Sequence, residues 1–375
     1  MQFTRKDVEL LSQSLNEPEW LLEERLYAFS ILEEFLAKDS SLAEKFGTYY
    51  TKVNRQLSKK SSNVEKSSGL GRMTLHDLLF NALRGEFAKE AFLSKEFKPE
   101  KSPEIAFILA FFTECSFYFA EAGQPCDFRS EVVGGISLDL FFLEANCTGK
   151  IVRTLKDGMK LEEYSYSSNT NFESLIVNNG DHDTAFLSSA NLIGENALVN
   201  TYSASFGSGK IETLNKLTGH NAQAYDVELF VEADNNKMNL NSVLQHSGTA
   251  TKGNICVKGI ARDSASVKLD GMIKVDKDGG GAESFLDQHV MLMNPGCHAE
   301  ANPELEIENN NVMSRHSASV AQIDEEKLFY AESRGLNSDQ AKQMLVDGFL
   351  NSAVEKIKDE KMKEEILELV GKHQQ

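Results

Sequence analysis

The feature that most constrains the fold is a long stretch, from about Val132 to Val320, made of short runs in which apolar and polar residues alternate. Gly, Asn and Asp interrupt these runs at short intervals. An apolar residue at every second position predicts a β-strand with one apolar face. Clear cases are Val227-Glu-Leu-Phe-Val-Glu, Met272-Ile-Lys-Val-Asp and Glu304-Leu-Glu-Ile-Glu. The sequence therefore predicts a core built from many short strands.

The connections between these strands narrow the choice of architecture. Helical spacing of apolar residues is absent from the stretch, so the long crossover helices of a doubly wound sheet are missing. An antiparallel sandwich and a solenoid of stacked turns both remain possible, and composition does not separate them. For a solenoid, we expect Leu305 and Ile307 to point into its interior.

Helical patterns occupy both ends of the chain. Residues 1–131 read as helical, with apolar residues at helical spacing after Pro18. Asp324 is placed to cap a helix at the other end, and Gly335 is placed to stop it. A second apolar stripe runs from Ala341 to Ala353. The polar segment Ser58–Gly71 contains many helix-breaking residues, and we expect a loop there.

Composition excludes several classes of protein. The 375 residues carry a net charge of −18, which argues against binding to nucleic-acid backbones or anionic membranes. No apolar run approaches the ~20 residues of a membrane-spanning helix. The five cysteines are scattered without a Cys-x-x-Cys pair, and the N-terminus is polar, so we expect reduced thiols and a cytoplasmic protein.

Motifs for nucleotide hydrolysis and for common enzyme classes are missing. Gly207-Ser-Gly-Lys lacks the upstream glycine and the following Ser or Thr of a phosphate-binding loop. No nucleophile elbow, zinc-protease motif or dinucleotide fingerprint occurs. We therefore expect a chain that binds no nucleotide itself and is not an enzyme. A carbohydrate-active β-helix hydrolase or lyase is an alternative, but the acidic pairs fall in turns instead of gathering in a groove.

Two sets of motifs, near the two ends of the chain, resemble the SufB/SufD family of iron–sulfur cluster assembly scaffolds. The C-terminal set is Pro303-Glu-Leu-Glu-Ile, Arg315-His-Ser-Ala-Ser, Leu328-Phe-Tyr-Ala-Glu-Ser-Arg-Gly-Leu and Ala341-x3-Leu345-x3-Phe349. The N-terminal set is Glu17-Pro-Glu-Trp-Leu with Arg25-Leu26-x-Ala28. The resemblance implies a right-handed parallel β-helix core over 132–322, flanked by helical domains over 1–131 and 323–375.

The resemblance also implies a function and partners. Members of this family scaffold nascent iron–sulfur clusters, which they hold transiently, and they work with the ABC-type ATPase SufC. In the family the C-terminal helical segment is where this ATPase attaches, which would place Phe329, Tyr330, Arg334 and Phe349 in its dock. From the helical pattern alone, the same stripe could simply be core. The implied oligomer is a homodimer or a heterodimer with a SufB/SufD paralogue.

Cys297 and His316 are the candidate cluster-assembly and metal-ligand pair. They lie 19 residues apart, near the short end of the ~20–45-residue range of solenoid repeats, so one full turn could bring thiolate and imidazole together. Both groups ligate iron. In the resemblance, Cys297 falls where SufB carries its cluster-building cysteine, and His316 falls on a position shared by SufB and SufD. The alternative is a buried cysteine and a strand-end histidine with structural roles.

The chain mixes marks of both branches of the family. Ser317 follows the histidine where SufB-like chains carry Glu, and the motif Pro303-Glu-Leu-Glu-Ile resembles the SufD branch. Such a mixture would fit a homodimer in which each copy supplies Cys297 and His316. It would equally fit a SufD-like adaptor without its own cluster. His298 and Glu300 read as solvated neighbours, and the other cysteines read as packing residues: Cys115, Cys126, Cys147 and Cys256.

Overall fold

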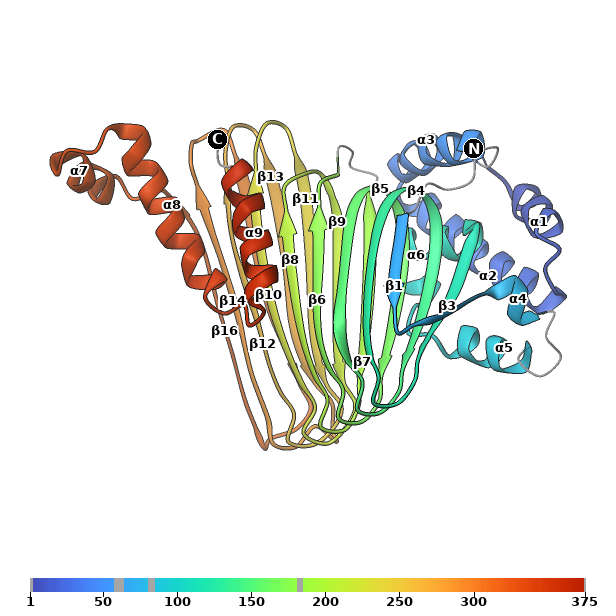
Figure 1. Cartoon of the computed structure of the whole chain (residues 1–375). Helices are drawn as coiled ribbons and strands as arrows, with labels where there is room; N and C mark the ends of the chain where they lie inside the picture. The colour runs from blue at the N-terminus through green and yellow to red at the C-terminus, as the bar shows by residue number, and fades with distance from the viewer. Residues whose placement is uncertain (1–2, 57–63, 80–84, 181–184, 374–375) are drawn as a thin grey trace.

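The computed structural model describes residues 3–56, 64–79, 85–180 and 185–373. It is mainly β, with a parallel solenoid of about eight turns and helices at both ends (Figure 1). The expected loop Ser58–Gly71 lies partly outside the described residues, and Val64–Ser68 within it forms strand β1. The antiparallel sandwich left open by composition is excluded, because nearly all strands pair in parallel.

The strands of the solenoid follow one another with short connections. In chain order they are β3 (Glu114–Ala120), β4 (Pro125–Leu143), β5 (Thr148–Tyr166), β6 (Asn171–Asn178), β7 (Phe186–Ile193), β8 (Leu198–Ser205), β9 (Gly209–Leu217), β10 (Gln223–Glu232), β11 (Lys237–His246), β12 (Lys252–Ala261), β13 (Ser266–Val275), β14 (Ala282–Leu292), β15 (His298–Ile307) and β16 (Val312–Gln322). Strand structure thus begins before the boundary expected at residue 132.

Each turn of the solenoid uses two strands, one on each wall. Even-numbered strands from β6 to β16 pair with each other in parallel, and odd-numbered strands from β7 to β15 do the same. The long strand β5 bends between the walls, because its first half pairs with β6 and its second half with β7. Residues one turn apart are therefore separated by two strands and two bends, as for Ser284 and Ser314, which lie 30 positions apart.

A column of left-handed residues forms one corner of the solenoid. Most are asparagine, which tolerates positive φ better than other residues with a side chain. The amide of Asn196, with φ 54°, donates to the carbonyl of His220, and Asn221, with φ 55°, repeats this bond to Thr249. The column comprises Asn146, Asn169, Asn196, Asn221 and Ala250. The asparagines that interrupt the alternating runs are thus explained by the bends.

The interior of the solenoid is filled by alternate residues of both walls. Buried rows include Val267, Leu269, Ile273 and Val275 on β13. The ring of Phe230 lies so close to Gly259 that a Cβ there would approach it to 2.3 Å. Glycine at this position therefore makes room for a large inward ring in the preceding turn.

The N-terminal helices cover the first turns of the solenoid. They are α1 (Arg5–Ser14), α2 (Glu19–Lys38), α3 (Ser41–Gln56), α4 (Leu75–Leu79), α5 (Gly85–Ser94), the short 3-10 helix η1 (Pro99–Lys101) and α6 (Pro103–Phe111), with the short strands β1 (Val64–Ser68) and β2 (Gly71–Thr74) between them. Every residue from Glu104 to Phe111 is buried, and α2 packs on α6. This apolar cluster continues onto the outward residues of β3, β4 and β5, and the inward Tyr118 and Phe128 of the first turn are buried as well, so this end of the solenoid is closed.

Arg25 and Glu17, from the N-terminal motif, form a buried ion pair. The guanidinium donates to both carboxylate oxygens at 2.5 and 2.7 Å and to the carbonyls of Ala110 and Phe112. These bonds tie the start of α2 to the end of α6. The motif therefore has a structural role at the closed end of the solenoid.

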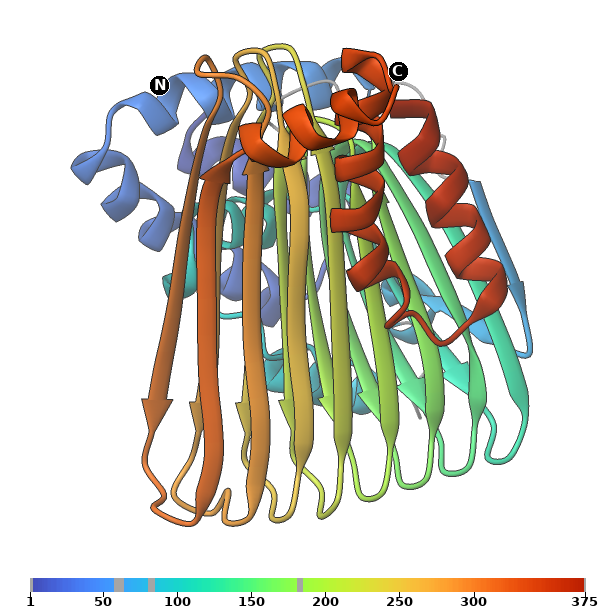
Figure 2. The same cartoon turned by 90° about the vertical axis from the view of Figure 1, so that its left-hand side faces the viewer.

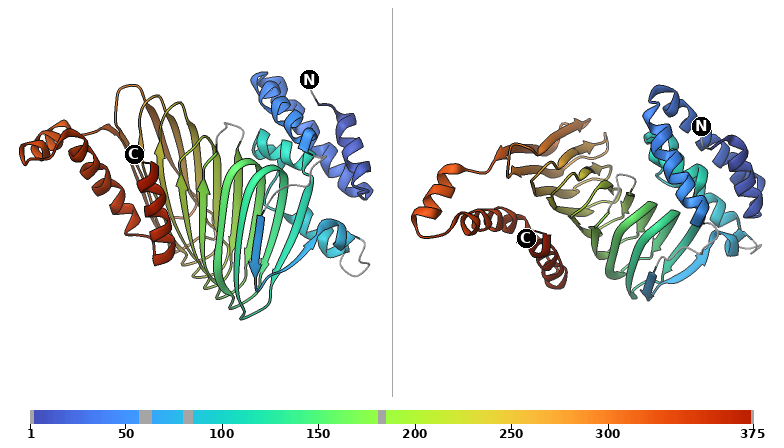
Figure 3. Two further views of the ribbon diagram at one scale, coloured as in Figure 1. Left: turned by 45° about the horizontal axis from the view of Figure 1, so that its top comes forward. Right: turned by 90° about the horizontal axis from the view of Figure 1, so that it is seen from above.

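The C-terminal helices are α7 (Glu325–Ser333), α8 (Ser338–Val354) and α9 (Glu360–His373). The end of α8 and all of α9 lie over the outer face of the even-numbered wall, whereas α7 and the start of α8 extend away from it (Figures 1, 2 and 3). An apolar cluster joins α8 and α9 to β10, where Val227, Leu229 and Val231 point outward. No helix among the described residues has the length and apolar character to cross a membrane.

Candidate functional site

The last turn of the solenoid is uncovered. Strands β15 and β16 stand at the two ends of the hydrogen-bonded strand order, so within the described chain each pairs on one side only. Leu305 and Ile307 continue the inward row of β13, because they pair with the buried Ile273 and Val275. They are nevertheless 37% and 42% exposed. The expectation that both residues face the interior is confirmed, with the addition that no further turn of the described chain covers them.

His316 belongs to this uncovered end. It lies on β16 and pairs with Leu286, a fully buried residue of the interior, so its side chain continues an inward row. It is exposed because β16 is the final strand of its wall. The imidazole is thereby presented at the open end of the solenoid, where another chain can reach it.

Cys297 lies in the bend that leads into β15 and is 7% exposed. Its thiol donates to the carbonyl oxygens of Ala261 and Asn294, at 3.1 and 3.0 Å. The sulfur packs in the interior core of the solenoid. In this conformation the thiol of Cys297 is a hydrogen-bond donor that holds a bend together.

The expected approach of Cys297 to His316 is wrong. Cys297 precedes the first residue of β15, level with the end of β14, whereas His316 pairs with Leu286, six residues before that end at Leu292. At ~3.3 Å per strand residue, the two lie on the order of 20 Å apart along the strands. The physical reason is the length of one turn: 19 residues cover little more than one wall, whereas a full turn here takes 30.

A polar cluster on the outer face of the last two turns was not predicted. Asp287 accepts hydrogen bonds from Ser317 and from Nε2 of His289, both at 2.6 Å, and Nδ1 of His289 lies 2.6 Å from the hydroxyl of Ser319. Burial alone would raise the pKa of Asp287, but these bonds and the charge of Lys356 hold it below its ordinary value. The unusual Ser317 thus anchors a carboxylate of the neighbouring turn.

The remaining cysteines and charged neighbours of Cys297 are placed as expected. Cys115, Cys126 and Cys147 are buried, although on or beside strands instead of helices. Cys256 faces outward beneath the C-terminal helices, 3.0 Å from the ammonium of Lys356. His298 and Glu300 are exposed and contact each other at 3.1 Å.

The four residues of the expected ATPase dock fall into two groups. Phe329 and Tyr330 on α7 are 72% and 60% exposed, and Arg334 donates to the hydroxyl of Tyr330 at 3.1 Å. Phe349 lies on α8 and is partly buried, with the ammonium of Lys258 over its ring. The α7 face, defined here as Phe329, Tyr330 and Arg334, is therefore free surface, whereas Phe349 packs against the solenoid.

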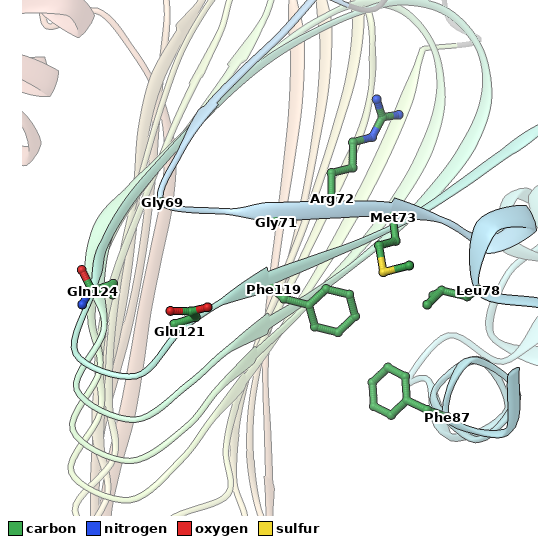
Figure 4. A pocket seen from close by; sticks show the side chains of 9 residues that line it. All are labelled: Gly69, Gly71, Arg72, Met73, Leu78, Phe87, Phe119, Glu121 and Gln124. Carbon is green, nitrogen blue, oxygen red and sulfur yellow. The ribbon is translucent and has the colours of Figure 1, made fainter. Parts of the chain in front are cut away.

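A cavity of about 770 Å³ lies at the closed end, between the β2–β3 pair and helices α4 and α5 (Figure 4). Met73, Leu78, Phe87 and Phe119 point into it, whereas Arg72 points away. It is far from Cys297, His316 and the α7 face, which belong to the other end of the solenoid.

Comparison with known proteins matches this architecture. Residues 160–349, about half of the chain, match the family model "SUF system FeS cluster assembly, SufBD core domain". SufD from Bacillus subtilis (strain 168) is 29% identical over 132 residues, 35% of this chain and 30% of the relative. SufD from Escherichia coli (strain K12) is 26% identical over 182 residues, 48% of this chain and 43% of the relative. SufB from B. subtilis is 26% identical over 134 residues, 36% of this chain and 29% of the relative.

These matched segments span less than half the length of each of the three relatives. The model match covers the solenoid from β5 onward and extends into α8, so it includes both His316 and the α7 face. Sequence motifs, a parallel solenoid with helices at both ends, and the match over half of the chain agree. The chain belongs to the SufB/SufD family of the SUF iron–sulfur cluster assembly system.

Proposed function

We propose that this chain is a scaffold subunit of a SUF-type assembly complex, which pairs through its open solenoid end with a second SufB/SufD-family chain and docks an ABC-type ATPase on its α7 face. The observation that carries the proposal is the uncovered last turn with His316 on its inward row. Nascent iron–sulfur clusters are the cargo of such a complex.

The open end favours a partner of the same fold. An uncovered parallel edge offers unpaired backbone groups to another strand, and a stable fold covers such edges. The exposed inward residues Leu305, Ile307 and Val320 add apolar surface that a further turn would bury. A second copy or a paralogue supplies strands at the same spacing, so the two solenoids would stack end to end.

Within such a pair, His316 would lie at the junction between the two chains. A neutral imidazole is a borderline donor that ligates iron, and the partner would supply the remaining ligands. Cys297 would join only after a rearrangement, because its thiol is buried and donates to two carbonyls. Thiolate ligands must lose their proton before they bind iron. We propose that ATP binding by the partner ATPase drives that rearrangement.

The α7 face suits an ATPase partner that carries the hydrolysis itself. Two aromatic rings and a guanidinium, standing clear of the solenoid, are residue types enriched at the energetic centres of interfaces. Phe349 would act indirectly, because it anchors α8 on the solenoid. The proposal therefore assigns direct contact to Phe329, Tyr330 and Arg334.

A SufD-like adaptor without its own cluster is the second candidate. The burial of Cys297 and the Ser317–Asp287 hydrogen bond favour it, since the thiol is shielded and the SufB-like Glu is absent. Alkylation of the native protein separates the two candidates: an adaptor keeps Cys297 unreactive with and without the ATPase and ATP, whereas a scaffold exposes it when they are present.

The decisive test is anaerobic reconstitution of the complex with iron and sulfide, followed through the visible absorption of the bound cluster. His316→Ala should lose most of the absorption or make it labile, and Cys297→Ser should do so if the rearrangement occurs. Cys147→Ser is the matched control, because that thiol is also buried and donates to a backbone carbonyl, at 3.0 Å. Equal clusters in the parent, His316→Ala and Cys297→Ser would overturn the scaffold assignment.

The dock is tested by point substitutions. Deleting the C-terminal helices would uncover the apolar outer face of β10 and β12, so loss of binding would be ambiguous. Phe329→Ala with Tyr330→Ala leaves that cover in place and should abolish co-purification with the ATPase. Leu10→Ala, at an exposed apolar position on α1, is the control.

A further inference from the structure

Two carboxyl groups lie side by side inside the solenoid. Asp226 and Glu228 alternate with the outward Val227 on β10, so both point inward, and they are 3% and 1% exposed. Asn191 donates to Asn215, and Asn215 donates to Asp226 across the solenoid at 3.3 Å. The pair is thus an integral part of the interior.

The interior surroundings of this pair contain no opposite charge among the described residues. In register with the pair lie Thr201 and Ser203 on β8 and Ile255 and Val257 on β12. Across the interior, Asn215 and Ser242 hydrogen-bond to the two carboxyl groups. The buried Glu162, by contrast, lies 2.8 Å from Arg153 and 3.1 Å from Lys160. Two neighbouring buried carboxylates cannot both stay charged without a counter-charge.

Two oxygen atoms at this point have no hydrogen-bond partner among the residues that the structure describes. They are Oε2 of Glu228 and the hydroxyl of Ser203, each within a side chain that is at least nine-tenths buried. Ser203 is the register partner of Glu228 on the preceding turn, and both belong to the inward row. A buried polar atom without a partner is costly, so a donor set left open in this way indicates a missing ligand.

We infer that Asp226, Glu228 and Ser203 form a binding site for one hard divalent cation inside the solenoid. Carboxylate and hydroxyl oxygens are the donors that Ca²⁺, Mg²⁺ and Mn²⁺ prefer, and the site lacks the thiolate and imidazole of a soft-metal site. Two charges balance the two carboxylates. The cation would join β8 to β10 and thus stabilise two successive turns, independently of cluster assembly.

The composition of the site fits this class of ion. Among the described residues, no three His, Cys, Asp or Glu side chains gather into a metal cluster, so neutral oxygens complete the set. A proton competes with the cation for these oxygens, because burial raises the pKa of Glu228 above its ordinary value, and burial together with the neighbouring Glu228 carboxylate raises the pKa of Asp226. The cation should therefore bind more tightly at pH 8 than at pH 6.

The test uses the full-length chain, treated with EDTA, dialysed and refolded at pH 8 with or without CaCl₂, MgCl₂ or MnCl₂. Refolding gives the ion access, because the interior is packed. The expected results are one bound divalent ion per chain by elemental analysis after removal of excess salt, and a rise in Tm with that ion. Mn²⁺ should also show the broadened electron paramagnetic resonance signal of a bound ion.

The matched variants are Asp226→Asn with Glu228→Gln, which keep the shapes of the side chains, and Asp278→Asn with Glu308→Gln, which remove two exposed carboxylates. The first pair should abolish both the bound ion and its effect on Tm, and the second pair should keep both. The inference is overturned if the parent retains no divalent ion, or if the ion and the Tm rise persist in the first pair. If the double variant Asp226→Asn with Glu228→Gln does not fold, the inference is decided by comparing the metal content of the parent with that of the single variant Glu228→Gln.

Discussion

The two ends of the solenoid differ in whether their inward side chains are buried. At the first turn the inward Tyr118 and Phe128 are buried, α2 and α6 cover the outer face of the same strands, and even Arg25 there is completely buried and paired. At the last turn, Leu305, Ile307 and Val320 continue buried rows yet remain more than one-third exposed, and His316 is exposed beside them. A stack of identical turns has no natural end, so each end requires a cap or a partner. The bare end is therefore the face that we propose binds a second chain.

The largest expected effect on stability comes from placing an aspartate at equivalent inward positions of two successive turns. Val275 is fully buried and pairs with Ile307, which is 42% exposed. Val275→Asp buries an unpaired carboxylate and should lower the free energy of unfolding by about 3 kcal/mol or more. Ile307→Asp in the isolated chain should cost only about 1 kcal/mol, because water still reaches the carboxylate. Urea denaturation of both variants tests this, and equal costs would mean that the last turn is covered.

Two arginine–glutamate pairs offer the next contrast. Arg25→Ala leaves Glu17 buried without its partner and should cost about 3 kcal/mol. Arg129→Ala removes a pair in which the two side chains are 55% and 36% exposed, and should change stability by less than about 1 kcal/mol. Thermal unfolding of the two variants is the measurement. A small effect at Arg25 would show that the packing of α2 on α6 does not depend on this pair.

A smaller effect is expected from pH. Burial raises the pKa of the inward Glu232 to about 8, so the folded chain holds a proton there that the unfolded chain releases near pH 4.5. Its contribution to stability is complete below pH 4.5 and is lost as pH rises towards 8. Between pH 5 and 7 the loss should be roughly 2 kcal/mol.

Two variants isolate this contribution of Glu232. Glu232→Gln should remove that part of the pH dependence, whereas Glu304→Gln on the exposed β15 serves as the control for losing one carboxyl group. The comparison between variants is needed because the buried His246, whose pKa is lowered to about 4, changes stability in the opposite direction over the same range. Parallel stability–pH curves for the parent and Glu232→Gln would contradict the assignment.

The sequence predicted the strands and the inward direction of Leu305 and Ile307, because alternation within one strand is a local property. It did not reveal how much chain one turn consumes, and the expected contact between Cys297 and His316 failed for that reason. The cluster of Asp287, His289 and Ser317 was missed because Ser317 reaches the other two only through the pairing of β14 with β16, which joins residues 30 positions apart. On β10 the apolar residues Val227, Leu229 and Val231 point outward beneath α8 and α9, so alternation alone could not show that Glu228 and Glu232 face the interior.

We propose that a second SufB/SufD-family chain covers the open end of the solenoid. The most direct measurement is the mass and composition of the complex retained by the tagged chain after co-expression with the SUF proteins of its own genome. The parent and Phe329→Ala/Tyr330→Ala should each retain one further SufB/SufD-family chain, whether a second copy or a paralogue. Val320→Asp, on the exposed inward row of β16, should lose that chain while remaining folded. A Val320→Asp protein that retains the second chain as fully as the parent would contradict pairing through the open end.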